Sequence, residues 1–120
     1  MGELAAARAG HVKDCIVGIR SILEGKTFEE ARAETVVWLA FERYLQILSE
    51  ASRHIPASWK TQFGRDLPWQ NIADLGNVLR HAYDRANAAV YWSIHENDLD
   101  PLEAAIDAML AAHGQPGAGA

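Results

Sequence analysis

The sequence has a single cysteine, Cys15, so no intrachain disulfide can form and the chain suits a reducing cytosol. It has no apolar run near the roughly 18 residues of a membrane span. The first ten residues lack the basic start and long apolar core of a signal peptide. The five histidines show no HxxxH spacing, so we expect no metal site, and nothing points to a cofactor. These absences predict a cytoplasmic protein without a membrane segment.

The chain also lacks a positive net charge and the common nucleotide-binding and hydrolase motifs. Its formal net charge is −5, so it gains no global attraction to nucleic acid, and any contact with RNA must come from a local basic cluster. We find no glycine-rich phosphate loop and no serine nucleophile elbow.

What the 120 residues do contain is apolar positions at helical spacing, without the alternation of strands. The pattern predicts an all-α, up-and-down bundle of four to five helices. We expect one domain over residues 1–113 and a disordered Gly/Pro/Ala tail over residues 114–120. Cys15 falls on the apolar face of the first helix and is interpreted as a small buried hydrophobe.

The first predicted helix covers residues 4–23 and ends before Gly25, since glycine is favoured just past a helix terminus. Thr27 and Glu30 form a capping box that starts a second helix, which we expect to continue to about His54. Its middle, residues 36–41, is apolar on every side, which predicts a central helix that is buried all round.

The second half of the chain is predicted as a loop over residues 57–66, anchored by Trp59 and Phe63, and then three helices. The first of these starts near Pro68 and reaches about residue 82, and the second covers residues 87–96. A turn or bend at residues 97–101 follows, with Asp100 as the N-cap of the last helix.

Residues 76–83 hold an amide, a guanidinium, an imidazole and a phenol, in Asn77, Arg80, His81 and Tyr83. On a helix Asn77 and His81 share a face at i,i+4. A histidine can act as a general base near neutral pH, and a guanidinium suits a phosphate by geometry and charge. Together these groups could run a metal-free ribonuclease. The plainer alternative is a histidine and an arginine that complement the dipole at a helix end.

Two further features bear on this stretch. Gly76 lies inside a predicted helix, where it costs roughly 1 kcal/mol against alanine, so it indicates close packing or a changed residue. Arg43 and Glu50 lie seven residues apart on one helix face, with Gln46 between them. They form either a solvated stripe or internal ion pair, or a polar lining beside a site.

The sequence resembles the HepT-like family of the HEPN superfamily, whose signature is usually read as Arg-Asn-x-x-x-His-x-Tyr. Asn77, His81 and Tyr83 match in register, and residues 67–73 and 96–102 resemble the stretches that flank the motif in the family. Arg43 and residues 49–51 resemble positions of the family's long second helix.

The resemblance implies the toxin half of a toxin–antitoxin pair whose antitoxin is a minimal nucleotidyltransferase. It further implies a homodimer with the two motif regions facing each other, and metal-independent endoribonuclease activity on RNA. His81 would be the catalytic base and Asn77 a positioning residue. Tyr83 matches the tyrosine that the partner modifies with AMP, which silences the toxin by placing a bulky anion beside the cleft.

One departure from the family pattern is decisive for activity, because Gly76 stands where the motif has arginine. Arg80 could supply a cation from a neighbouring helix face, and Arg43 or Arg85 could do so across the dimer. Otherwise the chain is a catalytically degenerate binding module that still dimerises and binds its partner. The third alternative is a helical interaction protein without a role in nucleic-acid chemistry.

Overall fold

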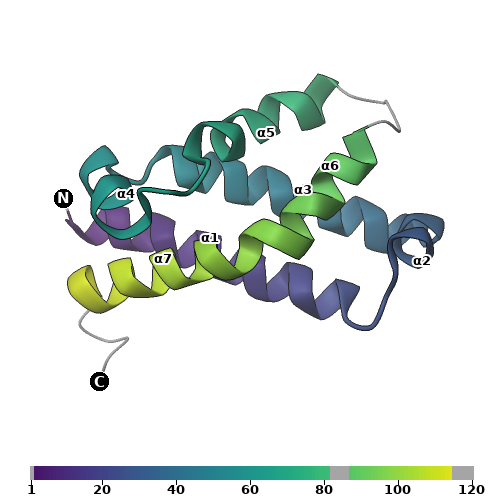
Figure 1. Cartoon of the computed structure of the whole chain (residues 1–120), viewed down its shortest axis with the longest axis horizontal. Coiled ribbons are helices and arrows are strands. Elements are labelled where there is room, and N and C mark those ends of the chain that lie inside the picture. The colour runs from purple at the N-terminus through teal and green to yellow at the C-terminus, as the bar shows by residue number, and fades with distance from the viewer. Residues whose placement is uncertain (1, 82–86, 115–120) are drawn as a thin grey trace.

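The computed structural model describes residues 2–81 and 87–114, without the side chains of Arg80 and His81. Within these ranges every regular element is helical, which confirms the predicted all-α bundle (Figure 1). None of these helices is long and apolar enough to cross a bilayer. The elements are α1 (Gly2–Leu23), α2 (Phe28–Ala33), α3 (Thr35–Arg53), α4 (Ala57–Gly64), α5 (Trp69–His81), α6 (Ala88–Ser93), the π-helical segment η2 (Ile94–Asp98) and α7 (Leu99–His113). The tail predicted over 114–120 falls outside the described residues beyond Gly114.

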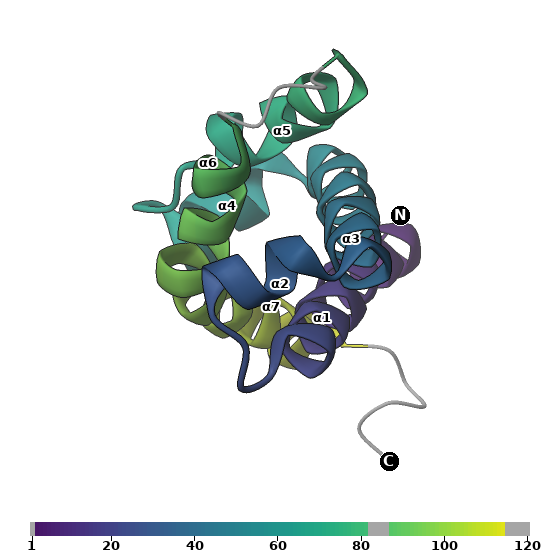
Figure 2. The same cartoon turned by 90° about the vertical axis from the view of Figure 1, so that its right-hand side faces the viewer.

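The long helices run up and down the bundle. Helix α3 is antiparallel to α1 and packs against it, α5 packs on α3, and α7 packs on α1 (Figure 1). Seen along the long axis, α5, α3 and α1 follow one another around one side of the bundle, and α6 and α7 form the other side (Figure 2). The buried core draws its largest side chains from α1, α3 and α7.

The predicted capping box is confirmed at the start of α2. The Glu30 backbone N–H donates to Thr27 Oγ1 at 3.1 Å, and the Thr27 N–H donates to Glu30 Oε1 at 2.9 Å. Gly25 ends the preceding turn with a φ of 73°, which favours glycine. The prediction of one helix from Thr27 to His54 is wrong, because the extended backbone of Glu34 separates α2 from α3. This break lets α2 fold back so that Phe28 packs on Trp92 of α6.

Helix α3 is not buried all round, so that prediction is also wrong. Val36 is 80% exposed and Leu39 is 58% exposed, whereas Phe41, Leu45 and Leu48 are fully buried. The reason is that α3 has α1, α5 and α2 as neighbours, and its remaining side faces outward (Figure 2). Its outer face is therefore available for other contacts.

The predicted loop over residues 57–66 is mostly the helix α4. The Pro56 carbonyl accepts the N–H groups of Trp59 and Lys60, which starts the helix. Trp59 is buried and stacks on the His113 ring at 4.1 Å, so tertiary packing stabilises a segment of weak helical pattern. The expected role of Trp59 and Phe63 as apolar anchors is consistent with this packing, since Phe63 also contacts His113.

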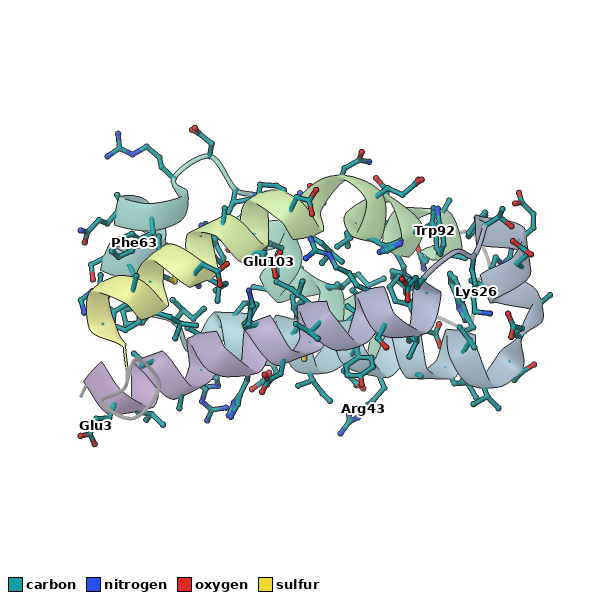
Figure 3. All side chains as sticks on the ribbon, turned by 90° about the horizontal axis from the view of Figure 1, so that it is seen from below. Glu3, Lys26, Arg43, Phe63, Trp92 and Glu103 are labelled. Carbon is teal, nitrogen blue, oxygen red and sulfur yellow. The ribbon has the colours of Figure 1, made fainter. Side chains whose placement is uncertain are left out.

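Helices α6 and α7 are joined without a turn, through η2. Asp100 is not an N-cap but lies inside the first turn of α7, where it pairs with Arg20 of α1. The π-helical turn of η2 accommodates the missing N–H of Pro101. Glu103 lies between α1 and α7 (Figure 3) and pairs with both Lys13 and Arg20. The chain changes direction between α6 and α7 at η2 (Figure 1), so the bend predicted at residues 97–101 is present, although no turn interrupts the helical backbone.

Candidate functional site

Gly76 marks the closest approach of α5 to α3. The hydroxyl of Ser49, which is fully buried, donates to the Ala73 carbonyl at 3.0 Å. The Gly76 N–H in turn donates to Ser49 Oγ at 3.0 Å. A Cβ added at position 76 would lie 3.2 Å from Ser49 Oγ, tighter than ordinary van der Waals contact. The close packing predicted at Gly76 is therefore confirmed.

This contact explains why position 76 carries no side chain. Ser49 Oγ is bonded to α5 at both the carbonyl of Ala73 and the amide of Gly76, so moving it away from a side chain at position 76 would lengthen both hydrogen bonds. Any larger residue at position 76 must displace it. The absence of an arginine at position 76 is thus linked to the buried serine at position 49, which occupies the adjacent space.

A groove of about 390 Å³ opens beside this contact. Its lining comes from three helices that follow one another around the bundle. The polar and small residues along it are Arg8 and His11 from α1, Arg43, Gln46, Glu50 and Arg53 from α3, and Ala73 and Gly76 from α5. Figure 3 shows Arg43 pointing away from the ribbon toward solvent.

The Arg43, Gln46 and Glu50 series lies along this groove, and Arg43 and Glu50 are also exposed to solvent, so both the polar lining and the solvated stripe fit it. Arg43 Nη1 donates to Gln46 Oε1 at 3.0 Å. Glu50 Oε1 instead contacts His54 Nε2 at 3.2 Å. The carboxylate and the guanidinium each have another neighbour, so the pair is not a closed internal ion pair.

Helix α5 carries the motif toward one end of the bundle. Asn77 is exposed, and α5 continues without a break through Arg80 to His81. From Gly76 to His81 the backbone rises by about 7.5 Å along the helix axis. The side chains of Arg80 and His81 lie outside the described part, as do Tyr83 and Arg85 entirely. The structure thus brings Arg43 and Glu50 beside Gly76, and the roles predicted for the other motif residues stay predictions.

Three groove residues were not among the sequence candidates, namely Arg8, His11 and Arg53. Arg8 and His11 come from α1, more than 30 positions before the rest of the lining. Their pattern alone is that of a solvated helix face. Only the packing of α1 against α3 reveals that they face the groove.

The other titratable groups of interest lie in the core. Burial raises the pKa of the Cys15 thiol to about 11, which keeps it protonated and supports its reading as a hydrophobe. Burial lowers the pKa of His95, whose ring lies between Phe41 and Trp92 and whose Nδ1 has no hydrogen-bond partner among the described residues. In the described part of the chain, no three His, Cys, Asp or Glu side chains gather as metal ligands.

Comparison with known proteins places this architecture in a family. Residues 12–109 match the family model described as "Ribonuclease HepT-like". The chain is 30% identical over 76 residues to "Probable ribonuclease HepT" of Thermococcus cleftensis, covering 63% of this chain and 68% of that protein. It is 27% identical over 88 residues to "Putative RNase TTE0752" of Caldanaerobacter subterraneus subsp. tengcongensis, covering 73% and 78%. No solved structure matches the chain significantly.

Because the family model spans most of the chain, the protein belongs to the HepT-like ribonuclease family. The resemblance noted from the motif stretch is confirmed at this level. The relatives are named as ribonucleases, so the family is one of RNase-like proteins.

Proposed function

We propose that the protein is a metal-independent endoribonuclease and the toxin of a toxin–antitoxin pair. The observation that carries the proposal is the unbroken course of α5 through Asn77 to His81, on a chain of the HepT-like family. At i,i+4 the two residues share a helix face at an exposed end of the bundle. Both groups that the proposed reaction needs most are then on one rigid element.

In the proposed reaction His81 removes the proton of a ribose 2′-hydroxyl. The oxygen attacks the adjacent phosphorus, and the P–O5′ bond breaks to leave a 2′,3′-cyclic phosphate and a 5′-hydroxyl that takes up a proton. Asn77 positions the imidazole or the phosphate. Arg80 supplies the positive charge that stabilises the phosphorane oxygens.

The test of this function is cleavage of single-stranded RNA by the purified protein in the presence of EDTA. We expect His81→Ala to lower the rate by about 10²- to 10⁴-fold, the usual contribution of a general base. His54→Ala is the control, because His54 is an exposed histidine just past the C-terminal end of α3. Equal cleavage rates in the parent and in His81→Ala would refute the assignment.

One observation favours the second candidate, a degenerate binding module. The Gly76 N–H donates to the Ser49 hydroxyl, and the same hydroxyl leaves little room for a side chain at position 76. In that case the parent protein would not cleave RNA at all, yet would retain its oligomeric and partner contacts.

We propose that the protein is a homodimer that uses the outer face of α3. Val36 and Leu39, three residues apart near the start of α3, are both exposed and form an apolar patch. Pairing of two such patches would bury apolar surface that a single protomer exposes.

Substitution of the patch should therefore separate the protomers. We expect Leu39→Asp to convert a dimer into monomers in light scattering coupled to size exclusion. Leu4→Asp, at a leucine that is 66% exposed at the start of α1, should leave the dimer intact. A dimer that survives Leu39→Asp would rule out this interface.

We also propose a cytoplasmic partner, a minimal nucleotidyltransferase that transfers AMP to Tyr83. The added phosphate would repel RNA near His81. Incubation with the partner and ATP should add one AMP mass to a peptide that contains Tyr83, and should add none in Tyr83→Phe. Modification of that variant would place the acceptor elsewhere.

A further inference from the structure

Some cationic side chains of this acidic protein form ion pairs or cation–π contacts, and others do not. Within the described residues, Lys13, Arg20 and Lys26 each pair with a carboxylate. Arg32 and Lys60 instead lie over the rings of Phe28 and Trp69. These five described cations are thus committed to intramolecular contacts.

The arginines of the groove are the exception. Arg8, Arg43 and Arg53 have no carboxylate or aromatic partner in the part of the chain that the structure describes, although Arg43 contacts the neutral Gln46. Of the remaining described cations only Arg65 also lacks a carboxylate or aromatic partner, and Arg65 is not part of the groove lining. Three arginines without a carboxylate or aromatic partner among the described residues therefore line one groove.

The local charge of the groove opposes that of the whole chain. Its lining holds three arginines and His11 against a single carboxylate, Glu50. The chain as a whole carries −5. A concave surface with excess positive charge focuses its field on an anion, and guanidinium groups match phosphate oxygens in geometry.

We infer that this groove binds the phosphate backbone of single-stranded RNA, with Arg8, Arg43 and Arg53 as its phosphate ligands. The inference rests on the proposed function and extends it, since it assigns the phosphate contacts that Gly76 cannot make. Because Gly76 lines the groove and His81 lies about 7.5 Å further along α5, a strand in the groove is continuous with the reaction centre.

The lining also determines whether the groove can recognise the base sequence of an RNA. It contains no Phe, Tyr or Trp side chain on which a base could stack. Phosphate contacts fix the position of a strand without reading its sequence. The groove therefore holds RNA in register, and any sequence preference arises elsewhere.

The test is the affinity for a fluorescein-labelled 20-nucleotide single-stranded RNA, measured by anisotropy in a His81→Ala background at 50 and 200 mM salt. We expect Arg8→Gln, Arg43→Gln and Arg53→Gln each to weaken binding roughly 2- to 5-fold, and the triple variant about tenfold or more. The slope of log affinity against log salt should fall by about 2 in the triple variant, since each phosphate contact on a single strand contributes roughly 0.7.

Matched controls separate the groove from general charge effects. Arg65→Gln should leave the affinity unchanged. Glu50→Gln should tighten binding roughly 2- to 5-fold, because it removes the only carboxylate in the lining, whereas Glu24→Gln, at an exposed turn residue just past α1, should not. Losses in Arg65→Gln equal to those of the groove variants would overturn the inference.

Two further outcomes are decisive. AMP that displaces the RNA at equal phosphate concentration would show a site for free nucleotides and overturn the inference. RNA that binds through the three arginines without being cleaved by the parent would support the groove and refute the proposed nuclease. Cleavage of RNA by the triple variant with an unaltered KM would support the proposed nuclease and overturn the assignment of the groove.

Discussion

Arginine at position 76, combined with glycine at position 49, is expected to raise the rate of RNA cleavage by about 10²- to 10³-fold over the parent protein. That range is the effect of one donor placed against charge that develops in a transition state. Position 76 borders the groove and lies one residue before Asn77. A guanidinium there would reach both the bound strand and the proposed reaction centre.

The substitution at position 49 is needed because Ser49 occupies the space that a side chain at position 76 would enter. With Gly76→Arg alone, Cβ would meet Ser49 Oγ at 3.2 Å, and the two hydrogen bonds of that hydroxyl to α5 would be strained or lost. We expect the single variant to gain less activity than the double variant, because the displaced hydroxyl disturbs the position of α5. Ser49→Gly removes the hydroxyl and its Cβ, which relieves the contact.

The matched control replaces arginine with a neutral side chain of similar length, as Ser49→Gly combined with Gly76→Met. It should show the stability of the arginine variant without its gain in rate. If the neutral variant accelerates cleavage equally, helix stability and not charge limits the parent. If the arginine variant gains nothing over an active parent, then Arg80 or the groove already supplies the cation.

Phe41→Ala is expected to lower the free energy of unfolding by about 3–5 kcal/mol, a large part of the 5–15 kcal/mol typical of a domain. Phe41 is fully buried and makes edge contacts with Trp38 at 5.1 Å and Trp92 at 6.3 Å. Truncation would remove these contacts and leave a cavity between α3 and α6. The unpaired ring nitrogen of His95, 6.3 Å from Phe41 between centroids, would then border an empty space.

Urea unfolding monitored by circular dichroism at fixed protein concentration measures this loss. Phe28→Ala is the control, because Phe28 belongs to the same aromatic cluster but is only half-buried. It should cost clearly less than Phe41→Ala. Equal losses in the two variants would mean that the cluster is stabilised at its outer edge and not at its buried centre.

The sequence predicted the features that depend on neighbours along the chain. The Thr27 capping box and the end of α1 before Gly25 follow from local backbone chemistry. The break at Glu34, the helix α4 and the helical continuation at Asp100 could not be predicted. Each depends on a distant contact, which is Phe28 on Trp92, Trp59 on His113 or Asp100 with Arg20.

In the candidate site too, the features set by neighbouring residues were predictable, and those set by distant contacts were not. The energetic cost of glycine in a helix pointed to close packing at Gly76, but nothing local identifies Ser49, 27 residues earlier, as its neighbour. Arg43 and Glu50 share a face by helical spacing, whereas the approach of Arg8 and His11 requires the packing of α1 on α3. The order of Asn77 and His81 on α5 was predictable because it needs only one continuous helix.

The interlock of Ser49 with α5 also constrains the order in which substitutions can accumulate. A lineage with this pair that acquires an arginine at position 76 first must pass through a strained protein. One that first exchanges Ser49 for glycine has an open route. A serine at position 49 and a side chain at position 76 fit together only if Ser49 Oγ shifts by a few tenths of an ångström. The two positions, 27 residues apart in the sequence, are therefore coupled in the substitutions that they tolerate.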